Sequence, residues 1–204
     1  SRTRVRMAFD GQGILQAMDV DFQLDGGAYC TLSPVVLSRG AIHAGSAYRC
    51  PHVRILGRVF ATNTPPNGAF RGFGAPQAFF AIERHMDVAA RELGLEPLEL
   101  RRRNRMRDGD TTATSQPFVW QKNLDEVLDR ALSLSGYESR RREYEEWNRR
   151  SRDRKRGIGL ALFFHGTGFT GSGEKKLQSR ARLEITADGR AHILVANTEM
   201  GQGA

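Results

Sequence analysis

The feature that most constrains this chain is a glycine-rich stretch that runs directly into a helical pattern. Asn67–Gln77 reads NGAFRGFGAPQ, and its glycines at positions 68, 72 and 74 allow sharp bends and close approach to a neighbouring group. Pro76 suits the first turn of a helix, where its missing N–H costs nothing. Free N–H groups and the positive end of the helix dipole would favour an anionic ligand there. A plain tight turn before an amphipathic helix is the alternative.

The residues after Pro76 predict a long helix followed by a shorter one. No residue breaks the pattern from Gln77 to Leu93, and apolar residues recur on one face at helical spacing. That face consists of Phe79, Ile82, Met86, Ala89, Ala90 and Leu93. Gly94 suits the position that ends a helix, and Glu96–Leu100 begins the second one.

Strand patterns precede the glycine-rich stretch. Val5–Phe9 and Ile14–Leu24 flank the turn signal DGQG and predict a hairpin, and the second strand alternates between apolar and polar residues. Val53–Ala61 predicts a third strand, which we expect to lie antiparallel to the second. Tyr29–Leu37 fits a loop or a short helix. The predicted fold class is α+β, with mixed or antiparallel sheets and packed helices.

The second half of the chain alternates helical and strand patterns. Asn123 can cap a helix that starts at Leu124 and ends at Gly136, and a charged helix follows from about Ser139 to Asp153. GIGLALFF, from position 157 to 164, is typical of a buried strand that opens a new domain. Residues 180–186 and 191–196 predict a hairpin around the turn ADG.

The chain is basic, with a formal net charge of +8 over 204 residues, and the charge is concentrated in two runs. These are Arg101–Arg107 and Ser139–Arg156. A basic nucleic-acid-binding module is one interpretation, but neither run has aromatic residues spaced to stack bases. Solvated helical faces are favoured, and no nucleic-acid partner is expected. The sequence has no run of about 18 apolar residues, so it predicts no membrane span.

Cysteine usage limits the metal chemistry of this segment. Cys30 and Cys50 have no CxxC partner, so they cannot hold an iron–sulfur cluster or a structural zinc by themselves. A disulfide between them is possible, but two reduced thiols in a cytoplasmic protein are favoured.

The glycine-rich stretch resembles a known family. Gly68–Gln77, GAFRGFGAPQ, is similar to the molybdopterin-contacting loop of the xanthine dehydrogenase and aldehyde oxidase family. Ala81–Asn104 resembles the helix pair that follows that loop, and TEMGQG near the end resembles a second cofactor loop. The resemblance implies an internal fragment of a large molybdopterin-binding subunit, inactive in isolation. It implies that residues 1–156 are the C-terminal part of one molybdopterin-binding domain and residues 157–204 the beginning of a second.

The resemblance also implies an activity. Family members are molybdenum hydroxylases, oxidoreductases that hydroxylate a carbon next to nitrogen or an aldehyde carbon and pass electrons to 2Fe–2S clusters and FAD on other domains or subunits. The expected function is that of a xanthine dehydrogenase acting on purines or related N-heterocycles, in a cytoplasmic oligomer. An aldehyde or other heteroaromatic oxidase and a cofactor-free homologue are the alternatives.

The resemblance assigns roles to residues at three places in the chain. Arg71 and Gly72 would contact the cofactor in the glycine-rich stretch, and Phe73 would lie over the substrate ring. Arg39 matches an arginine that xanthine dehydrogenases use on the substrate, and it could offset charge that develops on a purine. An ordinary surface arginine is the alternative for Arg39.

Further roles fall near the end of the chain. Phe169 and Thr170 resemble a second stacking aromatic and its polar neighbour, which together with Phe73 would hold a flat heterocycle between two rings. The remaining cofactor contacts implied by the resemblance are Met200, Gly201 and Gln202. No residue is expected to ligate the metal directly. The general base and a substrate-side glutamate would lie outside these 204 residues.

Overall fold

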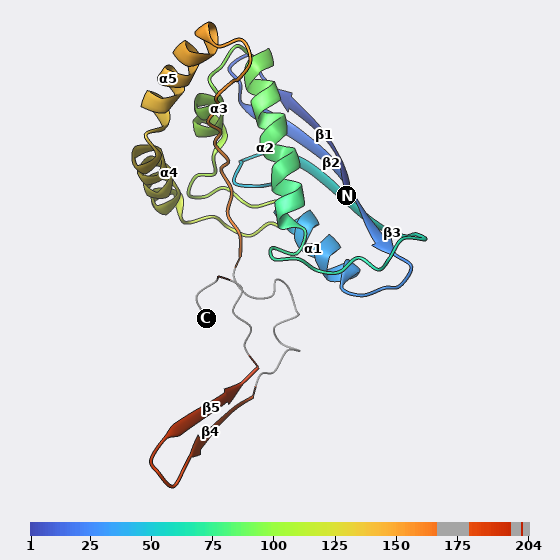
Figure 1. Cartoon of the computed structure of the whole chain (residues 1–204). Helices are drawn as coiled ribbons and strands as arrows, with labels where there is room; N and C mark the ends of the chain where they lie inside the picture. The colour runs from blue at the N-terminus through green and yellow to red at the C-terminus, as the bar shows by residue number, and fades with distance from the viewer. Residues whose placement is uncertain (167–179, 197–200, 202–204) are drawn as a thin grey trace. The chain divides into compact units, whose positions relative to one another are not determined.

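The structure is a computed structural model that describes residues 1–166, 180–196 and 201 (Figure 1). The chain divides into two compact units, Ser1–Phe164 and His165–Ala204. The glycine-rich stretch and the helix that follows it belong to the first unit. The division of the chain into two cofactor-binding domains after residue 156 stays a prediction.

The first unit is built on a sheet of strands β1 (Arg2–Phe9), β2 (Leu15–Gly27) and β3 (His52–Ala61), in the order β1-β2-β3. β1 and β2 form the predicted hairpin, but β2 and β3 are parallel, so the expected antiparallel pairing was wrong. The reason is helix α1 (Ser33–His43), which lies in the connection and carries the chain back to the starting edge of the sheet. The ambiguous stretch at Tyr29–Leu37 contains the start of this crossover helix.

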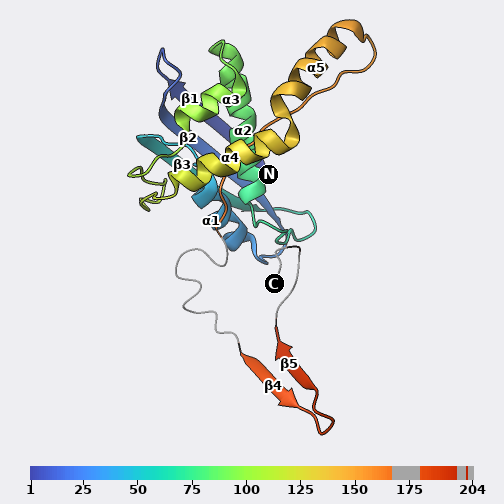
Figure 2. The same ribbon diagram turned by 90° about the vertical axis from the view of Figure 1, so that its left-hand side faces the viewer.

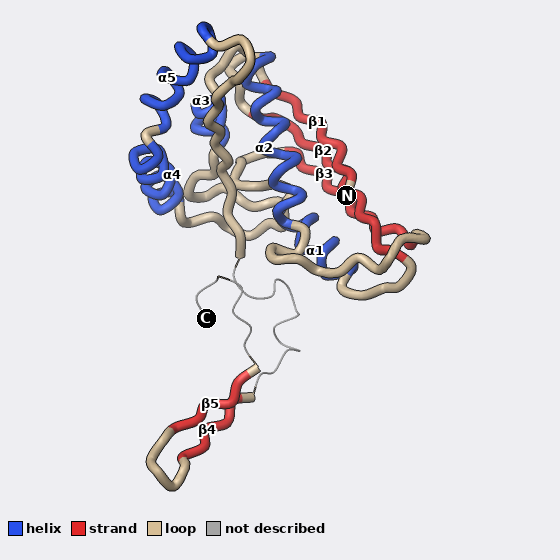
Figure 3. The backbone as a smooth tube through the Cα atoms, in the orientation of Figure 1, coloured by secondary structure: helices blue, strands red, loops and turns tan. Residues whose placement is uncertain are grey.

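The alternation predicted for the second strand is confirmed. Met18, Val20, Phe22 and Leu24 of β2 are all buried, and the residues between them lie on the opposite face. α1 and α2 (Ala75–Glu92) cover the apolar face of the sheet, as Figure 3 shows. The core of this unit therefore lies between the sheet and these two helices.

The helix after the glycine-rich stretch has the predicted position and face. α2 buries Phe79, Ile82, Met86, Ala89 and Ala90, while Leu93 lies just beyond its last turn and is partly exposed. Gly94 has a φ of 67°, the left-handed conformation expected after a helix end. The shorter second helix is α3 (Pro97–Asn104).

Two further helices follow, α4 (Gln121–Ser135) and α5 (Tyr137–Arg150), joined at Gly136 with a φ of 58°. Figure 2 shows α5 extending from the end of α4. The predicted start of α4 after an Asn123 cap was wrong. The helix begins three residues earlier than Leu124, at Gln121, whose N–H donates to Oδ1 of Asp108 at 2.9 Å.

The stretch from 157 to 164 is extended but is not a strand, so that prediction was wrong. No strand in the part of the chain that the structure describes pairs with it, and Leu162 is its one buried residue. Its side chains alone were typical of a strand, but a strand also needs a partner for its backbone groups. In the second unit, β4 (Ala181–Ile185) and β5 (Ala191–Val195) form the predicted antiparallel hairpin.

Candidate functional site

The glycine-rich stretch forms a turn of unusual backbone conformation just before α2. Gly72, Phe73 and Gly74 have φ angles of 91°, 47° and 90°, so three consecutive residues adopt positive φ. A phenylalanine in this region is sterically costly and persists only where surrounding contacts impose it. Hydrogen bonds from the Phe73 N–H to Phe70 O, 2.8 Å, and from the Ala75 N–H to Gly72 O, 3.0 Å, close the turn.

The close approach that the glycines permit is to α1. A Cβ added at Gly74 would lie 2.3 Å from the Val36 carbonyl oxygen, and one added at Gly40 would lie 2.3 Å from the Phe22 ring. The same added atom at Gly40 would also lie 3.1 Å from the Gly74 oxygen. Glycine at both positions therefore lets the turn pack directly on α1, which holds the turn in place.

The helix end itself offers fewer donors than its sequence suggests. Ala75 already donates its N–H to Gly72, and Pro76 has none. The Gln77 N–H is the donor in this first turn without a backbone acceptor among the described residues. An anionic ligand at this end of α2 could therefore be bound by the Gln77 N–H and by side chains beside the turn.

The outer side of the turn is open to solvent. Phe70 is 84% exposed and Arg71 is exposed, while Gly72 and Phe73 are partly buried. A turn that is fixed from behind by α1 and open in front can present its backbone and the Arg71 guanidinium to a bulky ligand.

Arg39 lies on α1, one residue before Gly40, and it is only 8% exposed. The alternative that it is an ordinary surface arginine is therefore wrong. Burial lowers the pKa of the Arg39 guanidinium. The Arg39 carbonyl is hydrogen-bonded to Nδ1 of His43 at 2.8 Å, and His43 packs edge-on against Phe79 of α2.

The structure brings together part of the predicted site. Arg39 lies on the helix that supports the turn, and Arg71, Gly72 and Phe73 form the turn itself. Gly201 has a φ of 98°, a conformation that favours glycine, and it belongs to the second unit. The other predicted residues lie outside the described residues. They are Phe169, Thr170, Met200 and Gln202.

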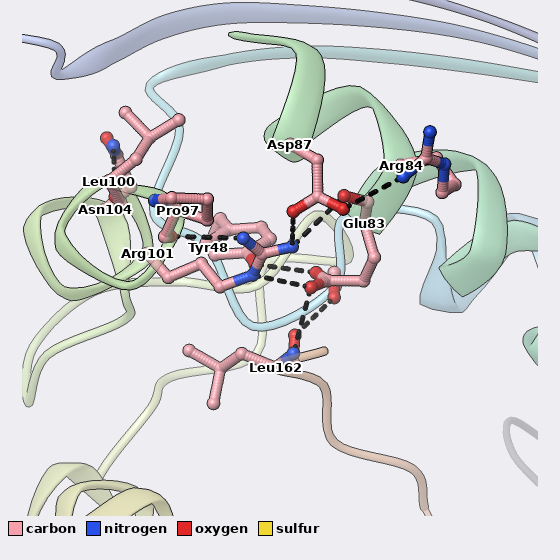
Figure 4. A network of polar contacts seen from close by, with 10 residues as sticks. Tyr48, Glu83, Arg84, Asp87, Pro97, Leu100, Arg101, Asn104 and Leu162 are labelled. Carbon is pink, nitrogen blue, oxygen red and sulfur yellow. Dashed lines mark hydrogen bonds and ion pairs between the residues drawn. The ribbon is translucent and has the colours of Figure 1, made fainter. Parts of the chain in front are cut away.

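Sequence reasoning missed a buried polar cluster between α2 and α3 (Figure 4). The Glu83 carboxylate accepts hydrogen bonds from the Tyr48 hydroxyl at 2.6 Å, from Nε of Arg101 at 2.9 Å and from the Leu162 N–H at 2.9 Å. Nη2 of Arg101 also donates to the Glu83 carbonyl oxygen at 3.1 Å and to Asp87 at 2.9 Å. We call these five residues the Glu83 cluster.

The electrostatics of the Glu83 cluster follow from its burial. Loss of water raises the pKa of Glu83, and the neighbouring Arg101 guanidinium opposes that shift. Burial, and then the Glu83 charge, raise the pKa of Tyr48 well above its usual value. All three groups that face the carboxylate are donors, so the ionised form fits the site. The sequence held one signal of the Glu83 cluster: this charged residue interrupts the apolar face of α2 between Ile82 and Met86.

Ion pairs within the chain involve four of the five basic side chains of Arg101–Arg107, but only three of the nine in Ser139–Arg156. Arg102 pairs with Asp129 at 2.8 Å, and Arg105 pairs with Asp125. Arg156 stacks over the Trp147 ring at 3.8 Å. The prediction of solvated helical faces therefore fits these residues, but it was wrong for Arg101, whose side chain is completely buried.

The described ranges lack side-chain clusters suited to a metal ion and helices suited to a bilayer. No cluster of three or more histidine, cysteine, aspartate or glutamate residues suited to a metal ion occurs in residues 1–166 and 180–196. In the same ranges no helix has both the length and the apolar character needed to cross a bilayer. Cys30 and Cys50 are free thiols, as predicted.

Two family models match this chain. Residues 1–105 match the family model of a molybdopterin cofactor-binding domain, and residues 130–204 match a second model with the same description. The chain belongs to the molybdopterin cofactor-binding family of the xanthine dehydrogenases and aldehyde oxidoreductases.

Individual relatives place the chain within this family. Over 98% of its length it is 37% identical to the aldehyde oxidoreductase of Megalodesulfovibrio gigas and 34% identical to the xanthine dehydrogenase of Dictyostelium discoideum. The crystal structure of the aldehyde oxidoreductase from Desulfovibrio desulfuricans is similar over 94% of the chain, with a TM-score of 0.76 and 34% identity. The chain spans 21%, 14% and 20% of the lengths of these three proteins.

Proposed function

We propose that this chain forms part of the cofactor pocket of a molybdenum hydroxylase that oxidises purines or related N-heterocycles. The observation that carries the proposal is the turn at Phe70–Gly74, which packs on α1 at Gly74 and is exposed at Phe70 and Arg71, in a chain that belongs to the molybdopterin-binding family. Because the chain spans about a fifth or less of its relatives, the activity is a proposal for the whole protein.

The residues present fit a pterin cofactor. Arg71 and the Gly72 backbone are the proposed contacts in the glycine-rich stretch, and the family resemblance adds Met200, Gly201 and Gln202 as further proposed contacts. When bound, the molybdenum cofactor supplies the oxidative hydroxylation chemistry. The chain's own contribution is to fix these contacts in place: the turn packs on α1 and cannot shift without displacing Val36.

The proposed substrate class rests on Arg39. A guanidinium held in a largely water-excluded position could offset negative charge that builds on a heterocyclic ring during oxidation. Phe73 would stack on one face of the ring, and Phe169, next to Thr170, on the other. An aldehyde needs no such charge compensation. An aldehyde or other heteroaromatic oxidase is therefore the second candidate, and the similarity to an aldehyde oxidoreductase, at 37% identity, supports it as much as the 34–36% identity to xanthine dehydrogenases supports the first.

The remaining proposals concern partners and location. We infer that electrons leave through 2Fe–2S clusters and FAD on other domains or subunits, and that the protein is a cytoplasmic oligomer. A nucleic-acid partner is disfavoured because four of the five basic side chains of Arg101–Arg107 pair with acidic residues of the same chain, and neither run has aromatic residues spaced to stack bases.

Metal and pterin analysis of the full-length protein tests the proposal. We expect about one molybdenum and one pterin per chain, together with oxidation of N-heterocycles by an artificial electron acceptor. Arg71→Ala should lower the molybdenum content, whereas Arg107→Ala, a change in the basic run away from the turn, should not. A purified full-length protein that lacks both metal and pterin would support the cofactor-free alternative.

Replacing Arg39 separates the two substrate classes. In the loaded enzyme, Arg39→Met should reduce kcat for a purine on the order of 10²-fold, with a smaller effect on KM, because the charge develops mainly in the transition state. Oxidation of an aldehyde should change little. Unchanged activity on the purine would show that Arg39 is merely structural and would move the assignment toward aldehyde or other heteroaromatic oxidation.

A further inference from the structure

The carbonyl group of Arg39 is hydrogen-bonded to a side chain of its own helix. Nδ1 of His43, four residues further along α1, lies 2.8 Å from the Arg39 carbonyl oxygen. Because a carbonyl oxygen only accepts, Nδ1 carries the hydrogen. An α-helix already offers the backbone N–H of residue 43 to the same oxygen, so α1 does not need the imidazole bond in order to form. The imidazole bond is therefore an addition to the helix, made at the residue of the proposed substrate contact.

The His43 imidazole is itself held by α2. The residue is 6% exposed, and its ring lies edge-on to that of Phe79, with centroids 5.9 Å apart and an interplanar angle of 87°. The Phe79 ring in turn stacks on Phe163, with centroids 4.6 Å apart and an angle of 24°. An edge-on aromatic contact together with a hydrogen bond at Nδ1 fixes the orientation of the imidazole. His43 therefore connects the backbone of Arg39 to α2.

The residue after Arg39 is held by two further parts of the first unit. A Cβ added at Gly40 would lie 2.3 Å from the Phe22 ring of β2 and 3.1 Å from the Gly74 oxygen in the turn. The peptide group between Arg39 and Gly40 is thus in contact with β2 and the turn at Gly40, and tied to α2 through His43. The position of the Arg39 side chain is set by all three.

We propose that His43 is a positioning residue for Arg39: its Nδ1–H fixes the Arg39 peptide and thereby the place from which the guanidinium reaches the substrate. The proposal rests on the proposed function, which gives Arg39 its contact with the substrate. Because the arginine side chain is long, a small rotation of its peptide displaces the guanidinium by more than the backbone moves. A displacement of about 1 Å can cost on the order of 10²-fold in rate. A purely structural role needs only the aromatic ring against Phe79 and does not need the donor.

Two substitutions separate the donor from the ring. His43→Phe keeps a ring of similar shape against Phe79 and removes the donor, whereas His43→Asn removes the ring and keeps a donor. The chain itself shows that asparagine can make this bond: Asn104, the last residue of α3, donates from Nδ2 to the Leu100 carbonyl four residues earlier at 2.8 Å. His43 is likewise the last residue of α1. A structural role predicts that the Asn variant is the more damaged, and a positioning role predicts the Phe variant.

The measurements are kcat and KM of the full-length enzyme for a purine and for an aldehyde. His43→Phe should lower kcat for the purine about tenfold and change KM less than about threefold, because the guanidinium acts mainly in the transition state. Oxidation of the aldehyde should change little. His43→Asn should stay within about threefold of the parent on both substrates.

The matched control is His85→Phe. His85 is a half-buried histidine of α2 that lines a groove with Thr3 and Val5 of β1. The same replacement there leaves the Arg39 peptide untouched, so kcat for both substrates should stay at the parental value. In an Arg39→Met background, His43→Phe should cause no further loss on the purine, because the group that it positions is gone.

Either variant at His43 can refute the proposal alone, so the test survives if the other does not fold. Parental kcat for the purine in a folded His43→Phe enzyme would overturn it, and so would a loss of about tenfold in a folded His43→Asn enzyme. A further loss in the Arg39→Met background would also overturn it. If Arg39→Met itself leaves purine oxidation unchanged, the proposed substrate class fails and the inference fails with it. A loss at Arg39→Met with none at His43→Phe refutes this inference alone.

Discussion

Arginine–carboxylate pairs occur in two regions of the molecule, and they differ in how much water reaches them. Between α2 and α3 the Arg101 and Glu83 side chains are 0% and 7% exposed. On the outer face of the sheet, the side chains of Arg6 and Asp19 are 73% and 27% exposed. Asp19 also pairs with Arg54 at 2.9 Å, which gives the sheet a row of cross-strand charges.

The difference shows that burial, more than the presence of an ion pair, decides how much a charge contributes to the stability of the fold. Water and salt can replace a lost partner on the outer face of the sheet, so pairs there contribute little. In the interior no water takes the place of a missing partner, and the remaining charge is left unsolvated. The Glu83 cluster should therefore be intolerant of single changes.

The largest expected effect comes from removing one charge of the interior pair. Arg101→Met should lower the free energy of unfolding by about 3–5 kcal/mol, because the Glu83 carboxylate stays buried without its guanidinium. Arg102→Met, in the next position but with an exposed pair to Asp129, should cost less than about 1 kcal/mol. Hydrogen exchange of the α2 amides in the full-length protein measures both. Equal losses would show that burial does not decide the effect.

A buried neutral side chain tests whether burial or charge is responsible for the loss of stability when an interior partner is removed. Asn104 is fully buried, accepts from the Leu15 N–H at 2.6 Å and donates to the Gly13 carbonyl at 2.8 Å. Asn104→Ala should cost about 2–3 kcal/mol, since both backbone groups lose their partner away from water. Asn148→Ala is the control, because the hydrogen bonds of this half-buried asparagine with Arg156 are exposed to solvent. A loss of a few tenths of a kcal/mol at Asn104 would assign the interior effect to charge alone.

Acid should weaken the exposed pairs. Hydrogen bonds from Arg6 and Arg54 lower the pKa of Asp19, and one from Arg105 lowers the pKa of Asp125. A carboxyl whose pKa is lower in the folded state stabilises above its unfolded value of about 3.9, and that contribution disappears as the pH falls through the folded pKa. The melting temperature should therefore drop below about pH 4, and drop less in the Asp19→Asn, Asp125→Asn double variant. Parallel pH profiles would contradict this.

The smallest expected effect comes from Arg54, at one end of the row of cross-strand charges on the outer face of the sheet. Arg54→Met leaves Asp19 paired with Arg6, so the melting temperature should change little, and the change should vanish at about 0.5 M salt. The loss caused by Arg101→Met should persist in the same salt, because buried pairs are poorly screened. A salt-resistant loss at Arg54 would show that the outer face is less accessible to water than its exposure indicates.

Local patterns predicted much of the scaffold. The apolar period of α2, the alternation along β2 and the hairpins were predicted because each depends on residues close in sequence. The stretch from 157 to 164 shows the limit. Its side chains match a buried strand, yet a strand requires hydrogen-bond partners that its own sequence does not specify.

The candidate site divides in the same way. Asn67–Gln77 alone indicated a sharp turn before a helix and, through its resemblance, a molybdopterin-binding family, which the family models confirm. The sequence did not predict the packing of the Gly74 turn on the Val36 carbonyl. The two positions are distant in sequence and meet only when α1 folds back onto the sheet.

The sequence by itself determined the helices, most of the strands, the glycine turn and the family, since these depend on short-range spacing and on a motif. Only the tertiary structure decided that β2 and β3 run parallel and that Arg39 is buried. It also selected Arg101 from three adjacent arginines as the partner of Glu83. The three side chains are chemically identical, and only the direction in which α3 faces α2 removes one of them from water.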